Sequence, residues 1–252
     1  MIKIAIDGFD IEPFMNGLSD PYGCRIEALY RTYSYELPFV DYWVQLRDSE
    51  PTALIARLED AVILRITENS DLEELTQFVR FLSPRVVCCD GKYTLGLGGK
   101  RREGTILMSD KLMPIHKGFE LFEPSLREAY DVISESESEN FTVPPFENFF
   151  VDTVHRLKKH TSRLYVVRLN GEVAACIMTF AENKYAAVPG ALSVRHKFRG
   201  MGLGSFLISR LNNDLINEGR TVYFHRAPNE NIEFYARLGF TPYGTWAEYY
   251  QR

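Results

Sequence analysis

One arginine and three alternating glycines form the group of residues in this chain best suited to hold an anion. The sequence RGMGLG at residues 199–204 follows an alternating, strand-like stretch and precedes apolar residues at helical spacing. Gly200, Gly202 and Gly204 lack a Cβ, so the main chain can turn sharply and present free N–H groups where the helix dipole favours negative charge. Arg199 can add a charge-assisted hydrogen bond. The segment predicts a strand, an anion-binding loop and a helix.

The spacing of these glycines argues against two nucleotide-binding motifs. A P-loop needs G-x-x-x-x-G-K-[ST], and no lysine follows the glycines here. A dinucleotide fingerprint needs G-x-G-x-x-G, which neither Gly200 nor Gly202 can begin. A glycine-rich turn without a ligand stays open as the alternative.

The last thirty residues give a second pattern. Residues 221–227 predict a strand and residues 229–238 a short helix, with Gly239 at the position of a helix C-cap. Residues 240–250 predict an aromatic-rich closing strand.

Together the two patterns resemble the GCN5-related N-acetyltransferase (GNAT) family. The matching residues are Leu192-x-Val194 followed by Arg199-Gly200-x-Gly202-x-Gly204, and then Phe234-Tyr235-x-x-x-Gly239-Phe240. The resemblance covers residues 116–252. It implies an α/β (α+β) fold with a mixed, mostly antiparallel central sheet and helices on both faces, and an acyl-CoA-dependent N-acetyltransferase activity on an amine.

The resemblance also implies where acetyl-CoA lies. The pyrophosphate of coenzyme A would sit on the N–H groups of the glycine loop, and the pantetheine arm would follow the strand ending at Val194, which splays from its neighbour. The implied cofactor-binding residues are Leu192, Ser193, Val194, Arg199, Gly200, Met201, Gly202, Leu203, Gly204, Ser205 and Asn231. The chain departs from the family at Pro228, where an asparagine often precedes the tyrosine by seven residues, and at His196, where a proline is common.

In the family a tyrosine protonates the departing thiolate during direct transfer in a ternary complex, and Tyr235 matches it. Its alternative role is a core aromatic, because it lies on the apolar face of its predicted helix. Glu182 and Glu248, at or near strand ends, are candidates for the base, with solvated surface carboxylates as the alternative. His225, in the penultimate strand, is a further candidate for the acceptor cleft.

The acceptor, a small-molecule or protein amine, is not specified by the sequence. Residues 134–149 occupy the place where family members vary to fit their acceptors. Phe141, Phe146, Phe149 and Phe150 are candidates for the cleft or for the core. A non-catalytic acyl-CoA-binding sensor or interaction module is the main rival hypothesis, and a structural protein with a relic loop is the third.

Composition narrows the class of protein further. The 252 residues are 45% hydrophobic, enough for packed cores, and a net charge of -5 argues against a nucleic-acid partner. Four cysteines without paired C-x-x-C spacing indicate reduced core thiols, with no metal site and no disulfide framework. A short apolar start broken by Lys3 and Asp7, and the lack of a long apolar run, predict a cytoplasmic protein away from membranes. A homodimer is an open alternative for the oligomeric state.

The first half reads as a reduced copy of the same fold. A helix over residues 21–35 precedes three strands at 42–46, 52–58 and 61–66, a helix capped near Asp71 and a strand at 85–89. We therefore predict two domains, a degenerate and smaller GNAT-like α/β domain at 1–114 without the coenzyme A loop and a GNAT acetyltransferase domain at 115–252. Residues 92–104 predict a hairpin or interdomain loop, 119–124 an opening strand, 125–135 and 144–159 helices, and Asn170-Gly171 a hairpin turn.

Overall fold

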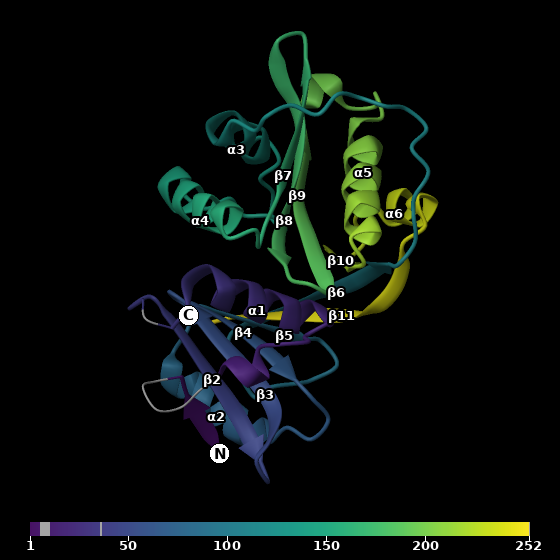
Figure 1. The fold of residues 1–252 in the computed structure, drawn as a ribbon. Coiled ribbons are helices and arrows are strands. Elements are labelled where there is room, and N and C mark those ends of the chain that lie inside the picture. Colours follow the sequence, from purple (N-terminus) through teal and green to yellow (C-terminus); the bar gives the residue numbers. More distant parts are fainter. Residues whose placement is uncertain (6–10, 36, 252) are drawn as a thin grey trace.

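A single mixed sheet of eleven strands runs through the part of the chain that the structure describes (Figure 1). The computed structural model describes residues 1–5, 11–35 and 37–251. Across the sheet the strand order is β1-β2-β3-β4-β5-β11-β6-β10-β9-β8-β7. The strands are β1 (Ile2–Ile4), β2 (Val40–Arg47), β3 (Glu50–Leu58), β4 (Ala61–Ile66), β5 (Val86–Asp90), β6 (Lys100–Ser109), β7 (Leu164–Leu169), β8 (Glu172–Glu182), β9 (Ala186–Val194), β10 (Thr221–Arg226) and β11 (Thr241–Tyr250).

The two halves repeat one path of the chain. Strands β2, β3 and β4 pair antiparallel, and helix α2 (Leu72–Leu82) then crosses over to β5, which pairs parallel with β4. In the second half β7, β8 and β9 pair antiparallel, and α5 (Leu203–Asn217) crosses over to β10, which pairs parallel with β9. The expected order of three strands, a helix and a strand in the first half is confirmed.

Each half is completed by the last strand of the other half. The C-terminal strand β11 lies between β5 and β6, and β6 lies between β11 and β10. In Figure 1 these two strands run between the purple half and the green half of the molecule. The prediction of a loop over residues 92–104 is wrong from Lys100 onward, because the arginine-rich run there begins β6 and pairs with β11.

Helices cover both faces of the sheet, as the fold-class prediction requires (Figure 1). On the first half, α1 (Pro21–Tyr33) packs Ile26 and Leu29 on one face, and α2 packs Leu75 and Val79 on the other. On the second half, α5 and α6 (Ile232–Leu238) share one core and α3 (Leu126–Ser134) and α4 (Phe146–Lys158) cover the opposite face.

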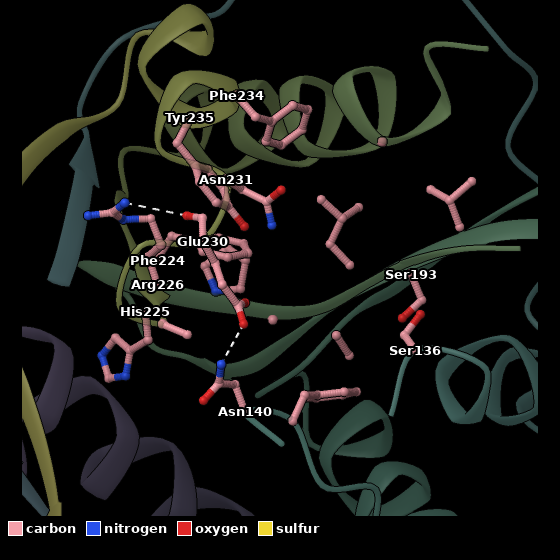
Figure 2. Close-up of a pocket in the computed structure, with 18 of the residues that line it drawn as sticks. Ser136, Asn140, Ser193, Phe224, His225, Arg226, Glu230, Asn231, Phe234 and Tyr235 are labelled. Atoms are coloured by element: carbon pink, nitrogen blue, oxygen red, sulfur yellow. Dashed lines mark hydrogen bonds between the residues drawn. The ribbon is translucent and has the colours of Figure 1, made fainter. Parts of the chain in front are cut away.

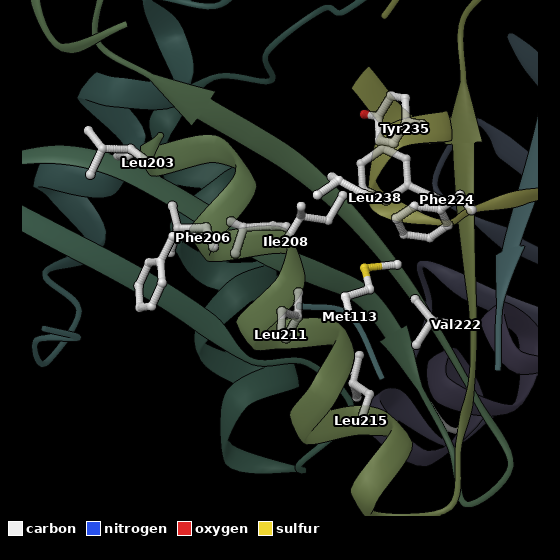
Figure 3. Packing of buried hydrophobic residues seen from close by; sticks show 14 of the residues in the cluster. Met113, Leu203, Phe206, Ile208, Leu211, Leu215, Val222, Phe224, Tyr235 and Leu238 are labelled. Atoms are coloured by element: carbon white, nitrogen blue, oxygen red, sulfur yellow. The ribbon is translucent and has the colours of Figure 1, made fainter. Parts of the chain in front are cut away.

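Buried apolar residues at helical spacing fix α5 over the site that follows. Leu203, Phe206, Leu207, Leu211 and Leu215 form one stripe that packs on β8, β9 and β10, in one core with residues of α6 (Figure 3). Because this stripe begins at the first residue of α5, the N-terminus of the helix is held beside the end of β9.

Two local predictions have different outcomes. The serine-capped helix is confirmed, since Ser125 Oγ accepts a hydrogen bond from Glu128 N at the start of α3. The strand predicted over residues 119–124 is wrong, because the structure has there only an isolated bridge between Phe122 and Val166. Within the described ranges, no helix combines the length and the apolar character needed to cross a bilayer.

Candidate active site

The glycine loop forms an open N-terminus for α5. Gly200 and Gly202 have φ angles of 78° and 91°, in the left-handed region that favours glycine. Gly202 is the N-cap of α5, and no side chain caps the helix. The first-turn N–H groups of Leu203, Gly204 and Ser205 therefore have no intrahelical acceptor, which makes the loop a site for an anion.

Strands β9 and β10 separate next to this loop. Their parallel pairing is confined to Ala186 with Thr221 and Ala187 with Val222. Thr221 N donates to Tyr185 O, so main-chain groups of every second residue from Tyr185, including Pro189, face β10. Because Pro189 has no N–H to donate, the ladder ends there and the strands diverge.

A bulge distorts β9 on the far side of this opening. Gly190 pairs with Met178 and Ser193 pairs with Cys176, so two residues of β9 oppose Ile177 alone. Ala191, one of these two, has φ 48°. Beside the bulge, a Cβ at Gly190 would overlap the ring of Phe180 in its present position.

A cavity of about 900 Å³ extends from the glycine loop through the opening between β9 and β10 to strands β6 and β11. Of the predicted cofactor-binding residues, ten of eleven line it: Leu192, Ser193, Val194, Arg199, Gly200, Gly202, Leu203, Gly204, Ser205 and Asn231. Met201 does not line the cavity, and its side chain is exposed. Ser193 Oγ is buried without a hydrogen-bond partner within the described part of the chain.

Tyr235 lies on the cavity wall in the middle of α6. Its ring packs against Phe224, with ring centroids 4.9 Å apart, and against Phe240 at 5.8 Å. Figure 2 shows Asn231, Phe234 and Tyr235 extending from this helix and its N-cap. Burial raises the pKa of the Tyr235 hydroxyl well above its usual range, and nearby Glu230 raises it further, so the hydroxyl stays protonated at neutral pH.

The opposite end of the cavity is formed by the strand exchange. We call it the arginine end and define it as Arg25 of α1, Arg102 of β6, and Trp246 and Glu248 of β11, all of which line the cavity. Glu248 Oε2 accepts a hydrogen bond of 2.6 Å from Tyr250 Oη, and Glu248 Oε1 lies 3.6 Å from Cys88 Sγ.

His225 lies on the cavity wall close to the arginine end. Its imidazole points toward α1 (Figure 2), where the Tyr22 ring lies 6.0 Å away between centroids. Burial lowers the pKa of His225 to about 3, and the charge of Arg25 lowers it further, so the ring is neutral. Nε2 has no hydrogen-bond partner in the ranges that the structure describes.

The two candidate bases have different surroundings. Glu248 faces the cavity. Glu182 does not line it: only 2% of the side chain is exposed, and Arg163 binds both carboxylate oxygens at 2.8 and 2.7 Å. The alternative of a solvated surface carboxylate is therefore wrong for Glu182, and its ion pair removes it as a candidate base.

The segment between α3 and α4 closes one side of the cavity, and sequence reasoning identified only part of its role. Phe141 lines the cavity, but Phe146, Phe149 and Phe150 do not, because they pack around Tyr130 and each other. Asn140 Nδ2 donates to Glu230 Oε1 at 2.6 Å, and Asn140 Oδ1 accepts from Arg102 (Figure 2 shows the first bond). Ser136, Ser138, Asn140 and Phe141 of the expected acceptor segment thus reach the cavity, and the three phenylalanines that follow do not.

Sequence reasoning missed Arg25 and Arg102 as cavity residues. Arg25 lies on a helix that the sequence pattern places in the first half, far from the glycine loop in the sequence. Arg102 falls in residues 92–104, for which the sequence predicts a hairpin or loop. Neither position carries a motif, so only the strand order could have found them.

The fold and the cavity define a mixed α/β protein with a splayed sheet beside an open, anion-binding helix N-terminus. Residues 160–242 match the model of the acetyltransferase (GNAT) domain. The matched segment is about a third of the chain and lies in its second half. No curated protein sequence matches the chain.

Solved structures extend the likeness of fold to the whole chain. A tandem GNAT protein from the clavulanic acid biosynthesis pathway is 14% identical, with a TM-score of 0.58, over 99% of this chain and 98% of that one. A GNAT acetyltransferase from Colwellia psychrerythraea is 10% identical, with a TM-score of 0.58, over 100% of both chains. A GCN5-related N-acetyltransferase from Sphaerobacter thermophilus is 17% identical, with a TM-score of 0.60, over 89% of this chain and 84% of that one. The chain therefore has a tandem GNAT fold.

Proposed function

We propose that this protein is an N-acetyltransferase that moves the acetyl group of acetyl-CoA to a primary amine by direct transfer in a ternary complex. The observation that carries the proposal is the continuous cavity that joins the open N-terminus of α5, the gap between β9 and β10, and the charged arginine end. A donor with a polyanionic head and a long amide-bearing arm fits the first two parts, and an acceptor fits the third.

The residues of the glycine loop suit the phosphates of coenzyme A. Unsatisfied N–H groups of Leu203, Gly204 and Ser205 would hold the pyrophosphate, and Arg199 would add a guanidinium. Arg199 Nε also donates to Val194 O at 3.2 Å, which ties the loop to the end of β9. Main-chain groups of Leu192 to Val194, with no partner strand on the β10 side, would pair with the amides of the pantetheine arm.

Transfer needs two proton movements that the cavity can serve. The amine loses a proton, its nitrogen bonds to the acetyl carbon, the C–S bond breaks, and the departing sulfur takes a proton. Glu248, directly or through water, is the proposed acceptor of the first proton, since it faces the cavity without a cationic partner among the described residues. Tyr235 is the proposed donor of the second, and a main-chain N–H near Val194 would stabilise the carbonyl oxygen.

Titration calorimetry with acetyl-CoA tests the cofactor site first. We expect micromolar binding, and we expect Arg199→Glu to weaken it at least about a hundredfold because a carboxylate would face the phosphates. Arg47→Gln, at an exposed position of β2, is the matched control and should bind like the wild type. Absence of binding to the folded wild-type protein would reject the proposal, whereas binding without turnover on any amine would favour the acyl-CoA sensor.

A further inference from the structure

The residues that line the cavity carry more positive charge than the binding of acetyl-CoA alone requires. Among the described residues, five arginines and two glutamates line it, in a protein whose net charge is -5. Arg199 and Arg237 belong to the glycine-loop side, with α5 and α6, where a polyanionic donor would lie. Arg226 points away toward β6, where it donates to Thr105 Oγ1 at 3.0 Å (Figure 2). Arg25 and Arg102 are thus left at the arginine end.

Neither of these two arginines is neutralised by a carboxylate. Within the described ranges, no ion pair shorter than 4.0 Å involves Arg25 or Arg102, although most other arginines of the chain have one. Arg102 donates to the neutral amide of Asn140 and stacks over the Tyr250 ring, 5.7 Å from its centroid. A cavity-lining guanidinium without a counter-ion favours an anionic ligand group, because an unpaired charge that is partly withdrawn from water is costly.

Arg25 and Glu248 lie on two sides of one thiol. Cys88 Sγ donates to Glu248 Oε1 at 3.6 Å, and Arg25 lies near enough for its charge to lower the pKa of the thiol, against the larger effect of burial. Burial raises the pKa of Cys88 to about 11, so the thiol stays neutral and cancels neither charge. A positive and a negative group therefore face the cavity within the span of a small molecule.

We propose that the acceptor is a small primary amine that also carries an anionic group, a carboxylate or a phosphate, which Arg25 and Arg102 bind while the amine lies at Glu248. This inference rests on the proposed function, since it names the acceptor class of that site. His225 fits the same arrangement, because its neutral ring offers a hydrogen bond near Arg25 without adding charge. The geometry disfavours polyamines, whose second ammonium group would meet Arg25.

Matched pairs of acceptors that differ only in the anionic group test this proposal. Transfer is measured by mass spectrometry for glycine and methylamine, L-phenylalanine and 2-phenylethylamine, L-lysine and cadaverine, and phosphoethanolamine and ethanolamine. We expect kcat/KM for the anionic member to exceed that of its partner by about tenfold or more in at least one pair, the gain of one charge-assisted hydrogen bond. The phosphoethanolamine arm distinguishes a phosphate from a carboxylate.

Variants at the arginine end assign the preference to its residues. Arg25→Gln and Arg102→Gln should each lower the ratio of kcat/KM for the anionic acceptor to kcat/KM for the uncharged one about tenfold. Arg25→Lys should lower this ratio less, because lysine keeps the positive charge but cannot form the two parallel hydrogen bonds of a guanidinium. Arg47→Gln should leave the ratio unchanged, and thermal unfolding followed by circular dichroism checks that each variant folds. A ratio that neither glutamine variant changes would overturn the proposal.

The failure of this inference is separable from the failure of the proposed function. If acetyl-CoA does not bind, the proposed function fails. If acetyl-CoA binds but no pair is acetylated, the same pairs are titrated by NMR into protein saturated with coenzyme A. If every anionic amine binds no more tightly than its uncharged partner, or is acetylated no faster, the proposed acceptor class is wrong and the proposed acetyltransferase function still stands.

Discussion

Tyr235 is the residue whose proposed role is most directly testable. The ring is fixed by Phe224 and Phe240, so Tyr235→Phe removes the hydroxyl with little change in packing. We expect kcat to fall about a hundredfold, the lower range for general acid catalysis, while acetyl-CoA affinity is unchanged. The measurement is steady-state transfer together with calorimetry. Equal kcat for the variant across pH 6–9 would leave Tyr235 as a core aromatic.

His225 should affect stability in acid. Its folded pKa of about 3 lies below the ordinary value of 6.5, so between these values the unfolded chain binds a proton that the folded protein does not. The stability that depends on the neutral ring is present above pH 6.5 and is lost as the pH falls toward 3.

His225→Asn should therefore flatten the acid limb of the stability curve. We expect the loss in unfolding free energy between pH 7 and pH 4 to be about 3 kcal/mol smaller than in the wild type, by urea titration at both pH values. His155→Asn, on a helix that does not line the cavity, serves as the control. Parallel curves for wild type and His225→Asn would contradict the buried, neutral imidazole.

At the scale of the element, β6 is the strand on which both halves depend. It pairs with β10 on one side and with β11 on the other, and Gly104 lies beside Arg226 of β10 and Trp246 of β11. A Cβ at Gly104 would overlap the Arg226 carbonyl oxygen and the Trp246 indole. Both contacts are with strands of the second half. A larger residue at position 104 would therefore weaken the pairing of β6 with β10 and β11.

Gly104→Ala should destabilise the protein by about 1–3 kcal/mol through overpacking. Gly98→Ala is the matched control, because a Cβ there meets nothing within 4 Å and the position has no positive φ. Chemical denaturation of both variants gives the comparison. Equal stability of the two would show that β6 adjusts without strain.

At the scale of the whole molecule, the exchange of β6 and β11 couples the two halves. The boundary between residues 114 and 115 stays a prediction. Separated there, residues 1–114 would lack β11 and residues 115–252 would lack β6. Strands β5 and β10 would each have one unpaired edge, and β6 and β11 would each lose both neighbouring strands.

We expect neither fragment alone to melt cooperatively, and we expect an equimolar mixture to regain one transition close to that of the intact chain. Scanning calorimetry of each fragment, the mixture and the full protein tests this. A fragment 115–252 that melts cooperatively and binds acetyl-CoA without its partner would show that the second half is an independent domain.

The sequence by itself determined the local elements and the half of the site that is built from consecutive residues. The glycine loop, the capped helices, the Asn170-Gly171 hairpin and Tyr235 on α6 depend on spacing within one turn or one strand, which short patterns encode. Pro189, which ends the pairing of β9 with β10, is visible in the sequence. Its effect could be inferred only from the structure, which shows that its main chain faces β10.

Only the tertiary structure decided the arginine end. Cys88 and Glu248 are 160 residues apart, and Arg25 and Arg102 join them because β11 enters between β5 and β6. The alternation of apolar and polar residues along a strand shows which face of the strand is buried. It does not show which strands pair with it, because that depends on the packing of the whole sheet. The same packing buried Glu182 against Arg163 and left Glu248 facing the cavity.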